Sequence, residues 1–373
     1  MGRHKGSLNK SKEENLENKP VEMKTNIEEL KKEVPTEQKT VSDITKDIST
    51  KEDDVTQISG VGDRTAEKLR EKGFITLTDV ATTRVDELGA VMGVGYAQAK
   101  AWVDDAMDKV SARMKLKTAV ESDNNRKTIH IFIKTGCEAL NKILGGGVST
   151  NSITGAMGEF ATGKTQLGFE LIVEVIGRLK KKAVFIETEP NTFHLDRLKE
   201  IAKLKGLECN WNNLYICESE QIPTPKAQFL QYKVIQKALE KGEEIMLVVI
   251  DSFNALFRGG WSRTEMLPIR TREFGEHFNL IRYLTAKYNM SWYLTFQTMT
   301  APRPEQQHVA QAKFGQEHYI VGGDYVLHTV DTWLALNKAP KGLGKAVLFD
   351  SSYLPRQMCI FRLTAKGLMD EVK

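Results

Sequence analysis

Short runs of apolar residues alternate with longer amphipathic segments from about residue 131 to the C-terminus. Each run is continuous, as in a strand that is covered on both faces. The segments between them carry apolar residues every three to four positions, which predicts helices. This order predicts an α/β fold with a mostly parallel, twisted sheet and helices on both faces. The predicted strands include 152–156, 183–186, 246–250 and 292–296, and the predicted helices include 166–178, 226–240 and 272–287.

The first fifty residues show no such pattern. They contain ten Lys or Arg and ten Asp or Glu but no aromatic residue, which predicts a disordered tail because too little apolar surface can be buried. The basic start loosely resembles an AT-hook, an arm that enters the minor groove of A·T-rich DNA. Since the central Arg-Gly-Arg of such a hook is missing, a solvated basic tail is the favoured interpretation.

Residues 51–112 repeat one short motif. The sequence G-V-G occurs at 60–62 and at 93–95, and each copy precedes an amphipathic run. Such a pair is typical of tandem helix-hairpin-helix units, whose turns offer backbone N–H groups to DNA phosphates. A small helical packing domain without DNA contact is the alternative. Residues 113–130 are polar and predict a linker.

The strongest local signal is a phosphate-binding loop. Residues 158–165 fit the pattern G-x-x-x-x-G-K-[ST] between a predicted strand and a predicted helix, as this motif requires. Its glycines let the backbone wrap the β-phosphate of ATP, Lys164 supplies charge to the β- and γ-phosphates, and the Thr165 hydroxyl ligates Mg²⁺. The predicted nucleotide-binding residues are Gly158, Glu159, Phe160, Ala161, Thr162, Gly163, Lys164, Thr165 and Gln166.

Polar residues at the ends of three further strands complete the predicted ATPase site. Asp251 follows an apolar strand and is expected to complete the Mg²⁺ shell. Glu189 is the candidate for orienting or deprotonating the attacking water, and Glu187 is the next candidate. An exposed carboxylate at a helix start is the alternative for Glu189. Gln297 closes another strand, where a polar side chain can sense the γ-phosphate.

Composition and charge limit the function without defining it. A net charge of +4 permits DNA binding but does not argue for it, so any DNA-binding charge must be concentrated locally. No apolar run is long enough for a membrane span, and the basic start leads into no secretory signal. We therefore expect an intracellular, cytoplasmic protein with no membrane partner. The four cysteines form no CxxC pair and are expected to be reduced thiols.

Together these motifs resemble the archaeal RadA recombinases and their eukaryotic relatives in the RecA/RadA family. The resemblance covers about residues 55–370 and implies a RecA-type P-loop ATPase core that uses ATP and Mg²⁺. It also implies a nucleoid-associated helical filament or ring of identical subunits. Such a filament would bind single-stranded DNA and exchange strands with double-stranded DNA, and mediator proteins are further candidate partners. The resemblance is carried by KTG…LGGG at 134–147, GEFATGKTQ at 158–166, FIETEPNTF at 185–193, VVIDSFNALFR at 248–258 and the paired G-V-G turns.

The resemblance implies roles for single residues in the nucleotide site. Glu189 matches the catalytic glutamate, and Gln297 matches the residue that senses the γ-phosphate and relays it to a DNA-binding loop. Arg197 matches an arginine that stacks on adenine. Asp350 and Pro355 match a segment with which a neighbouring subunit caps ATP, so the site would lie between protomers.

Two loops are implied to contact DNA, whose phosphates dominate the affinity of such complexes. Loop 1 follows Asp251 and runs to Arg270, and loop 2 spans 298–323 and is longer than the family leads us to expect. Ordinary surface charge is the alternative for any single arginine. The implied DNA-binding residues are Arg258, Arg263, Arg270, Arg303, Lys313, Gly322 and Gly323.

The linker departs from the family pattern. In the family it carries Phe-x-x-Ala, whose phenyl ring docks in the next subunit, and here the aligned residues run from Leu116 to Ala119. Leu116 and Ala119 are therefore the predicted oligomerisation residues, with a smaller anchor. The alternative is that Leu116 ends the preceding helix and packs on its own hairpin domain. With Ala161-Thr162 in place of the usual Gly-Ser, this indicates a divergent member or paralogue.

A strand-exchange recombinase is the favoured function. The alternative is a mediator that binds ATP and DNA or a recombinase partner without exchanging strands, but the complete set of ATPase residues argues against it. The N-terminal hairpin domain argues against a hexameric helicase. The predicted domains are a disordered tail at 1–50, a helix-hairpin-helix domain at 51–112, a linker with a polymerisation motif at 113–130 and a RecA-like ATPase core at 131–373.

Overall fold

The computed structural model describes residues 53–114, 116–258, 266–300, 318–320 and 322–371. The predicted disordered tail lies outside these residues. The chain divides into two compact units, Met1–Lys115 and Leu116–Lys373. None of the described helices is long and apolar enough to cross a lipid bilayer.

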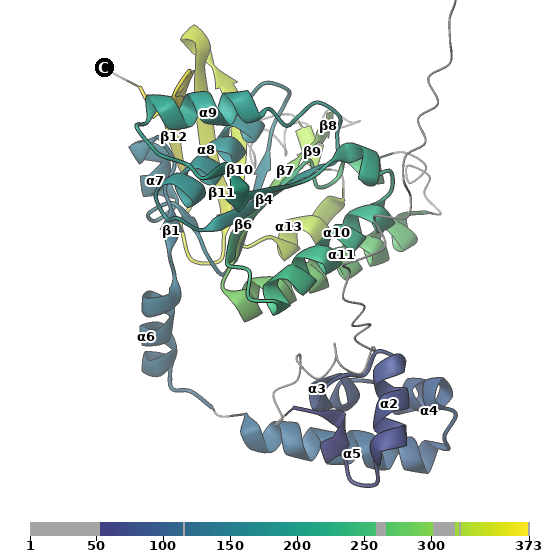
Figure 1. Cartoon of the computed structure of the whole chain (residues 1–373). Helices are drawn as coiled ribbons and strands as arrows, with labels where there is room; N and C mark the ends of the chain where they lie inside the picture. Colours follow the sequence, from purple (N-terminus) through teal and green to yellow (C-terminus); the bar gives the residue numbers. More distant parts are fainter. Residues whose placement is uncertain (1–52, 115, 259–265, 301–317, 321, 372–373) are drawn as a thin grey trace, which may run out of the picture. The chain divides into compact units, whose positions relative to one another are not determined.

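The first unit is all-helical in its described part (Figure 1). Each G-V-G turn opens a helix as predicted, because Gly62 is the N-cap of α2 and Gly95 is the N-cap of α5. Leu69, Leu88 and Trp102 lie in its small core. The elements are the 3₁₀ helix η2 (Val55–Gln57), α2 (Asp63–Glu71), α3 (Leu77–Ala81), α4 (Val85–Met92) and α5 (Tyr96–Arg113).

The second unit contains a sheet whose nine described strands have the order β13-β12-β11-β10-β3-β7-β6-β4-β5. Neighbouring strands are parallel from β10 to β5, so the predicted α/β fold with a mostly parallel sheet is confirmed. The pairs β10–β11, β11–β12 and β12–β13 are antiparallel, and these four strands were not predicted. The nine strands are β3 (Ser152–Met157), β4 (Lys182–Glu187), β5 (Leu214–Cys217), β6 (Ile245–Asp251), β7 (Ser291–Phe296), β10 (Thr332–Ala339), β11 (Leu343–Ser351), β12 (Gln357–Thr364) and β13 (Gly367–Asp370).

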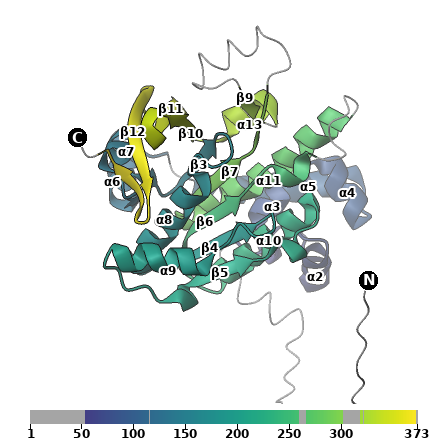
Figure 2. The same cartoon turned by 90° about the horizontal axis from the view of Figure 1, so that it is seen from above.

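Helices cover both faces of this sheet (Figure 2). Side chains of each central strand alternate between two cores: in β6, Leu247 and Val249 pack under one helical layer, and Val248 and Ile250 pack under the other. The first layer contains α7 (Glu138–Ile143), α8 (Lys164–Gly177) and α9 (Leu195–Leu204), and the second contains α10 (Pro225–Glu240), α11 (Leu267–Tyr288) and α13 (Gly323–Thr329). The remaining elements are the short strands β1 (Phe132–Ile133), β2 (Val148–Ser149), β8 (Thr298–Thr300) and β9 (His318–Ile320), and the 3₁₀ helices η3 (Trp211–Asn213), η4 (Ser219–Gln221), η5 (Ala255–Phe257) and η7 (Pro340–Gly342).

The predicted linker contains a helix, α6 (Ala119–Ile129). Thr118 and Glu121 form a capping box at its start, because Thr118 Oγ1 accepts from the Glu121 N–H at 3.2 Å and the Glu121 carboxylate accepts from the Thr118 N–H at 2.8 Å. The sequence of α6 has no apolar stripe, so the pattern of apolar residues did not predict this helix. Helix α5 ends at Arg113, so the alternative in which Leu116 ends that helix is wrong.

Candidate nucleotide and DNA site

The predicted phosphate-binding loop joins β3 to α8 through a backbone that favours glycine. Gly158 has a φ of +156°, and a Cβ atom there would lie 2.2 Å from the carbonyl oxygen of Leu336. Gly163, the N-cap of α8, has a φ of +99°. Ala161 also has a positive φ of +60°, which costs a residue with a side chain about 1–2 kcal/mol. The loop therefore ends at a helix N-terminus, where backbone N–H groups and the helix dipole favour a phosphate.

Lys164 and Thr165 begin α8 and reach the groups that the sequence predicts. Lys164 Nζ donates to the carbonyls of Gly158 and Glu159, both at 2.8 Å, so the ammonium lies within the loop. Burial lowers the pKa of Lys164, while the negative charge of Asp251 opposes this change. Thr165 Oγ1 donates to Asp251 Oδ2 at 2.6 Å.

Asp251 is held by hydroxyl groups from two elements. Thr165 bonds one of its oxygens, and Thr295 Oγ1, at the end of β7, bonds the other. Burial raises the pKa of Asp251, and the two hydroxyl groups oppose that rise. Oxygen donors of this kind fit Mg²⁺, which prefers carboxylate and hydroxyl ligands and usually needs only one or two from the protein.

The two candidate glutamates at the end of β4 and just after it have different surroundings. Glu189 Oε1 accepts from Ser252 Oγ at 2.7 Å, and Glu189 lines the same cavity as Lys164. Glu187 Oε1 instead accepts from the backbone N–H groups of Thr192 and Phe193 at 2.9 and 3.0 Å. Glu187 therefore stabilises the loop that follows β4, and Glu189 is the carboxylate that faces the cavity.

Gln297 directly follows β7 and contacts the segment that follows β6. Its backbone N–H donates to Asn254 Oδ1 at 2.8 Å, and Asn254 Nδ2 donates to the Gln297 carbonyl at 3.0 Å. The Gln297 side-chain oxygen accepts a hydrogen bond from Arg258, the last described residue before the gap at 259–265. The backbone of Gln297 is thus fixed to the segment that follows β6, and its side chain contacts a predicted DNA-binding arginine.

Arg197 has its guanidinium held on several sides. Its Nε donates to Gln166 Oε1 at 2.9 Å, and its terminal nitrogens donate to the carbonyls of Thr364 and Ala365 at 2.9 and 2.7 Å. Glu200 forms an ion pair with it. Arg197 therefore joins α8 and α9 to the turn between β12 and β13.

The wall of one cavity, with a volume of about 880 Å³, contains most of these groups. Its wall consists of the loop 158–166 with Glu189, Asp251, Ser252, Gln297 and Arg258, and on another side Arg197 with Leu363, Thr364 and Ala365. Phe160 is an exception among the loop residues, because its side chain is 91% exposed and only its backbone is integrated into the loop. A nucleoside triphosphate fits the chemistry of this cavity, with phosphate-binding groups on one side and a planar cation on another.

Other predicted residues lie away from this cavity. Asp350 and Pro355 are exposed and do not line it. Arg270 lies near the start of α11, where burial lowers its pKa. Gly322 has a packing role, since a Cβ atom there would lie 2.4 Å from Val326 Cγ2, and Gly323 begins α13. Arg263, Arg303 and Lys313 fall outside the described residues.

Several residues that line the cavity, or that hold its side chains in place, were missed by the sequence analysis. Ser252 and Asn254 were visible in the VIDSFN segment, where polar residues follow a buried strand, but their partners are not adjacent in sequence. Thr295 precedes Gln297 at the end of an apolar strand. The turn residues Thr364 and Ala365 carried no signal, because they contribute backbone carbonyls rather than side-chain chemistry.

Comparison with known proteins agrees with this arrangement. Residues 125–371 match the Rad51 family, and residues 52–108 match the SAM-like helix-hairpin-helix tandem family. The chain is 30% identical over 321 residues to the DNA repair and recombination protein RadA of Metallosphaera sedula, an alignment that covers 85% of this chain and 95% of that protein. The Rad51 match spans the sheet, the phosphate-binding loop and the turn that holds Arg197. The chain therefore belongs to the Rad51 family, and a tandem helix-hairpin-helix domain precedes its Rad51 domain.

Proposed function

We propose that this protein is a DNA-dependent ATPase that forms filaments on single-stranded DNA and promotes homologous pairing and strand exchange in recombination and repair. The contact between Arg258 and Gln297 carries this proposal. It connects a side chain of the nucleotide cavity to the segment that leads into predicted DNA loop 1. The same hydrogen-bonded pair of residues would therefore take part in both ATP binding and DNA binding.

The residues of the cavity support ATP hydrolysis. The loop and Lys164 would bind the phosphates, and Thr165 and Asp251 would hold Mg²⁺, which neutralises phosphate charge when bound. Glu189 would orient the attacking water and accept its proton, while Ser252 fixes one carboxylate oxygen at 2.7 Å. Arg197 would stack on the adenine ring, since four hydrogen-bond partners keep its guanidinium in place.

The coupling to DNA follows from the position of Gln297. When Gln297 turns towards a γ-phosphate, it releases Arg258, whose guanidinium is then available to a DNA phosphate. Binding of either ligand would favour binding of the other, because both require the same hydrogen bond to break. The hairpin domain at the N-terminus would add contacts to the phosphates of double-stranded DNA through the turns before α2 and α5.

Exposed residues away from the cavity support assembly into a filament or ring. Leu116 is 104% exposed in the segment between α5 and α6, where it would dock into the next subunit as the family anchor does. Asp350 and Pro355 are exposed away from the cavity of their own chain, as expected for residues that cap the ATP of a neighbour. Mediator proteins would act on this assembly within the cell.

A two-stage assay tests the proposal. ATP hydrolysis is first measured with and without single-stranded DNA, and D-loop formation is then measured with homologous duplex DNA. We expect DNA to stimulate hydrolysis and ATP to support D-loops. DNA-stimulated hydrolysis without D-loops would favour the mediator function instead, and hydrolysis that ignores DNA would contradict both.

A further inference from the structure

A buried carboxylate on α8 has no part in the proposed function. Glu170 lies one and a half turns after the phosphate-binding loop and is 0% exposed. A buried carboxylate is costly unless its charge is paired and hydrogen-bonded. The contacts of Glu170 therefore indicate what its charge holds in place.

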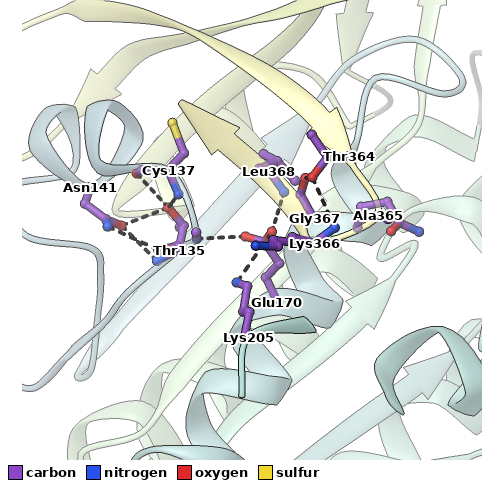
Figure 3. A network of polar contacts seen from close by, with 12 residues as sticks. Thr135, Cys137, Asn141, Glu170, Lys205, Thr364, Ala365, Lys366, Gly367 and Leu368 are labelled. Carbon is purple, nitrogen blue, oxygen red and sulfur yellow. Dashed lines mark hydrogen bonds and ion pairs between the residues drawn. The ribbon is translucent and has the colours of Figure 1, made fainter. Parts of the chain in front are cut away.

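Three separate segments converge on Glu170 (Figure 3). Its Oε2 accepts from the Gly136 N–H at 2.9 Å, and its Oε1 accepts from the N–H of Leu368 in β13. Lys205, the C-cap of α9, places its Nζ 3.7 Å from Oε1. Each carboxylate oxygen thus accepts a backbone hydrogen bond, and the ammonium of Lys205 balances the charge.

The turn between β12 and β13 is seated directly on this carboxylate. Gly367 has a φ of +99°, and a Cβ atom there would lie 1.6 Å from Glu170 Oε1, so only glycine allows this approach. Thr364 Oγ1 closes the turn by donating to the Gly367 carbonyl at 3.0 Å and accepting from the Lys366 N–H at 3.1 Å. The position of Glu170 consequently fixes the position of Thr364 and Ala365.

The opposite side of the same turn holds the arginine of the nucleotide cavity. The carbonyls of Thr364 and Ala365 accept from the Arg197 guanidinium, and both residues line the cavity. Arg197 and Lys205 lie at opposite ends of α9. One helix therefore holds the turn at two points, through Arg197 directly and through Lys205 by way of Glu170.

We propose that Glu170 is a positioning residue for the base-binding side of the nucleotide cavity: its carboxylate fixes the β12–β13 turn, and the turn fixes Arg197. This inference rests on the proposed function, in which Arg197 stacks on the base of ATP. Glu170 itself does not line the cavity. It acts through two backbone hydrogen bonds rather than by touching the nucleotide.

The same arrangement makes nucleotide affinity depend on pH. Burial raises the pKa of Glu170 to about 7, while Lys205 and the N–H groups of Gly136 and Leu368 oppose the rise. Among the described residues, the titratable groups that face it are Lys205 from α9 and Tyr293 from β7, and Tyr293 stays neutral because burial raises its pKa. Below pH 7 the protonated carboxyl is a weaker acceptor for both N–H groups, so the turn and Arg197 are held less firmly.

Calorimetry on the full-length protein tests this role with two probes. ATP presents a base and a triphosphate, whereas inorganic tripolyphosphate presents the phosphates alone and titrates in the same pH range. Glu170→Gln should weaken ATP binding about fivefold or more at pH 8, the lower end of typical coupling between sites, and should leave tripolyphosphate binding unchanged. The difference in ATP affinity between parent and variant should shrink at pH 6, where the parent carboxyl is also neutral.

Two further variants separate positioning from a general loss of structure. Glu174→Gln changes a carboxylate on the same helix whose partner is the surface residue Arg178, and its ATP affinity should match the parent. Lys205→Gln removes the balancing charge and should move the midpoint of the pH dependence of ATP affinity upwards. The Lys205→Gln variant therefore tests the inference even if Glu170→Gln does not fold.

The outcomes distinguish this inference from the proposed function. A parent protein that binds neither probe contradicts both. A parent that binds ATP, with Glu170→Gln binding it equally well at pH 8, overturns the positioning role alone. An equal loss of ATP and tripolyphosphate binding in Glu170→Gln also overturns it, because the effect would then not arise on the base side.

Discussion

Replacing Glu189 by glutamine should stop ATP turnover while preserving ATP binding. Glu189 Oε1 accepts from Ser252 Oγ at 2.7 Å, and the amide oxygen of glutamine can accept the same bond. The variant side chain therefore keeps its place but cannot accept a proton from water. Loss of a positioned base typically costs a factor of about 10² or more in rate, which corresponds to about 3 kcal/mol of barrier height.

Glu187→Gln is the matched control, because the same chemical change occurs two residues earlier, at the last residue of β4. Glu187 accepts backbone hydrogen bonds from Thr192 and Phe193 at 2.9 and 3.0 Å. Hydrogen bonds to a charged group contribute about 1.5–3 kcal/mol to stability. Glutamine can still accept both bonds but lacks the charge that strengthens them, so this variant should melt at a lower temperature than Glu189→Gln but turn over ATP within a few-fold of the parental rate.

Single-turnover hydrolysis on single-stranded DNA, ATP binding by calorimetry and thermal melting give the three quantities needed. Hydrolysis by Glu189→Gln at the parental rate would show that another group activates the water. A larger loss of turnover in Glu187→Gln would show that the two carboxylates have been assigned the wrong way round. Either result refutes the argument that the Ser252 contact marks the catalytic carboxylate.

Three further predictions concern assembly, DNA binding and stability. Leu116→Glu should abolish oligomers in light scattering while the monomer stays folded, since Leu116 is fully exposed in the single chain. Leu116→Phe should assemble at least as well as the parent. If Leu116→Glu assembles like the parent, the linker does not anchor the neighbouring subunit. Arg258→Ala and Arg270→Ala should each flatten the slope of log K against log salt by about 0.7 per lost phosphate contact on single-stranded DNA, and an unchanged slope removes that residue from the DNA contacts. Burial raises the pKa of Glu170 from 4.5 to about 7, so its stabilising contribution is present below pH 4.5 and is lost as the pH rises through 7. Urea titrations should show the unfolding free energy of the parent falling by about 3 kcal/mol relative to Glu170→Gln between pH 4.5 and pH 8. A difference in unfolding free energy that does not change with pH would contradict this.

Local patterns were sufficient to predict the central part of the fold. The strands β3, β4, β6 and β7 are continuous apolar runs because both of their faces are buried, and the spacing of the phosphate-binding loop is dictated by the shape of a phosphate. Helix α6 was missed because its residues have no apolar stripe. The capping box of Thr118 and Glu121 is the sequence feature that marks its start.

Contacts between distant segments could not be predicted in the same way. The sequence suggested a role for Arg197 but not the two carbonyls that hold it, which lie more than 160 positions further along the chain. Glu170 falls within an apolar helical run, where its sequence context gives no partner. Its burial depends on the antiparallel strands β12 and β13, which fold back over α8 and bring the Leu368 N–H to its carboxylate.

Glu170 has opposite expected effects on stability and on nucleotide binding. Its ionised form makes the fold less stable at pH 8, since a carboxylate that is 0% exposed has lost its hydration. The same ionised form is the better acceptor for Gly136 and Leu368, and so it holds the turn that carries Arg197. A residue with a merely structural role would lower stability and affinity together when replaced. Glu170→Gln should instead gain stability relative to the parent as the pH rises to 8 and lose ATP affinity over the same range, because one charge opposes folding and supports binding.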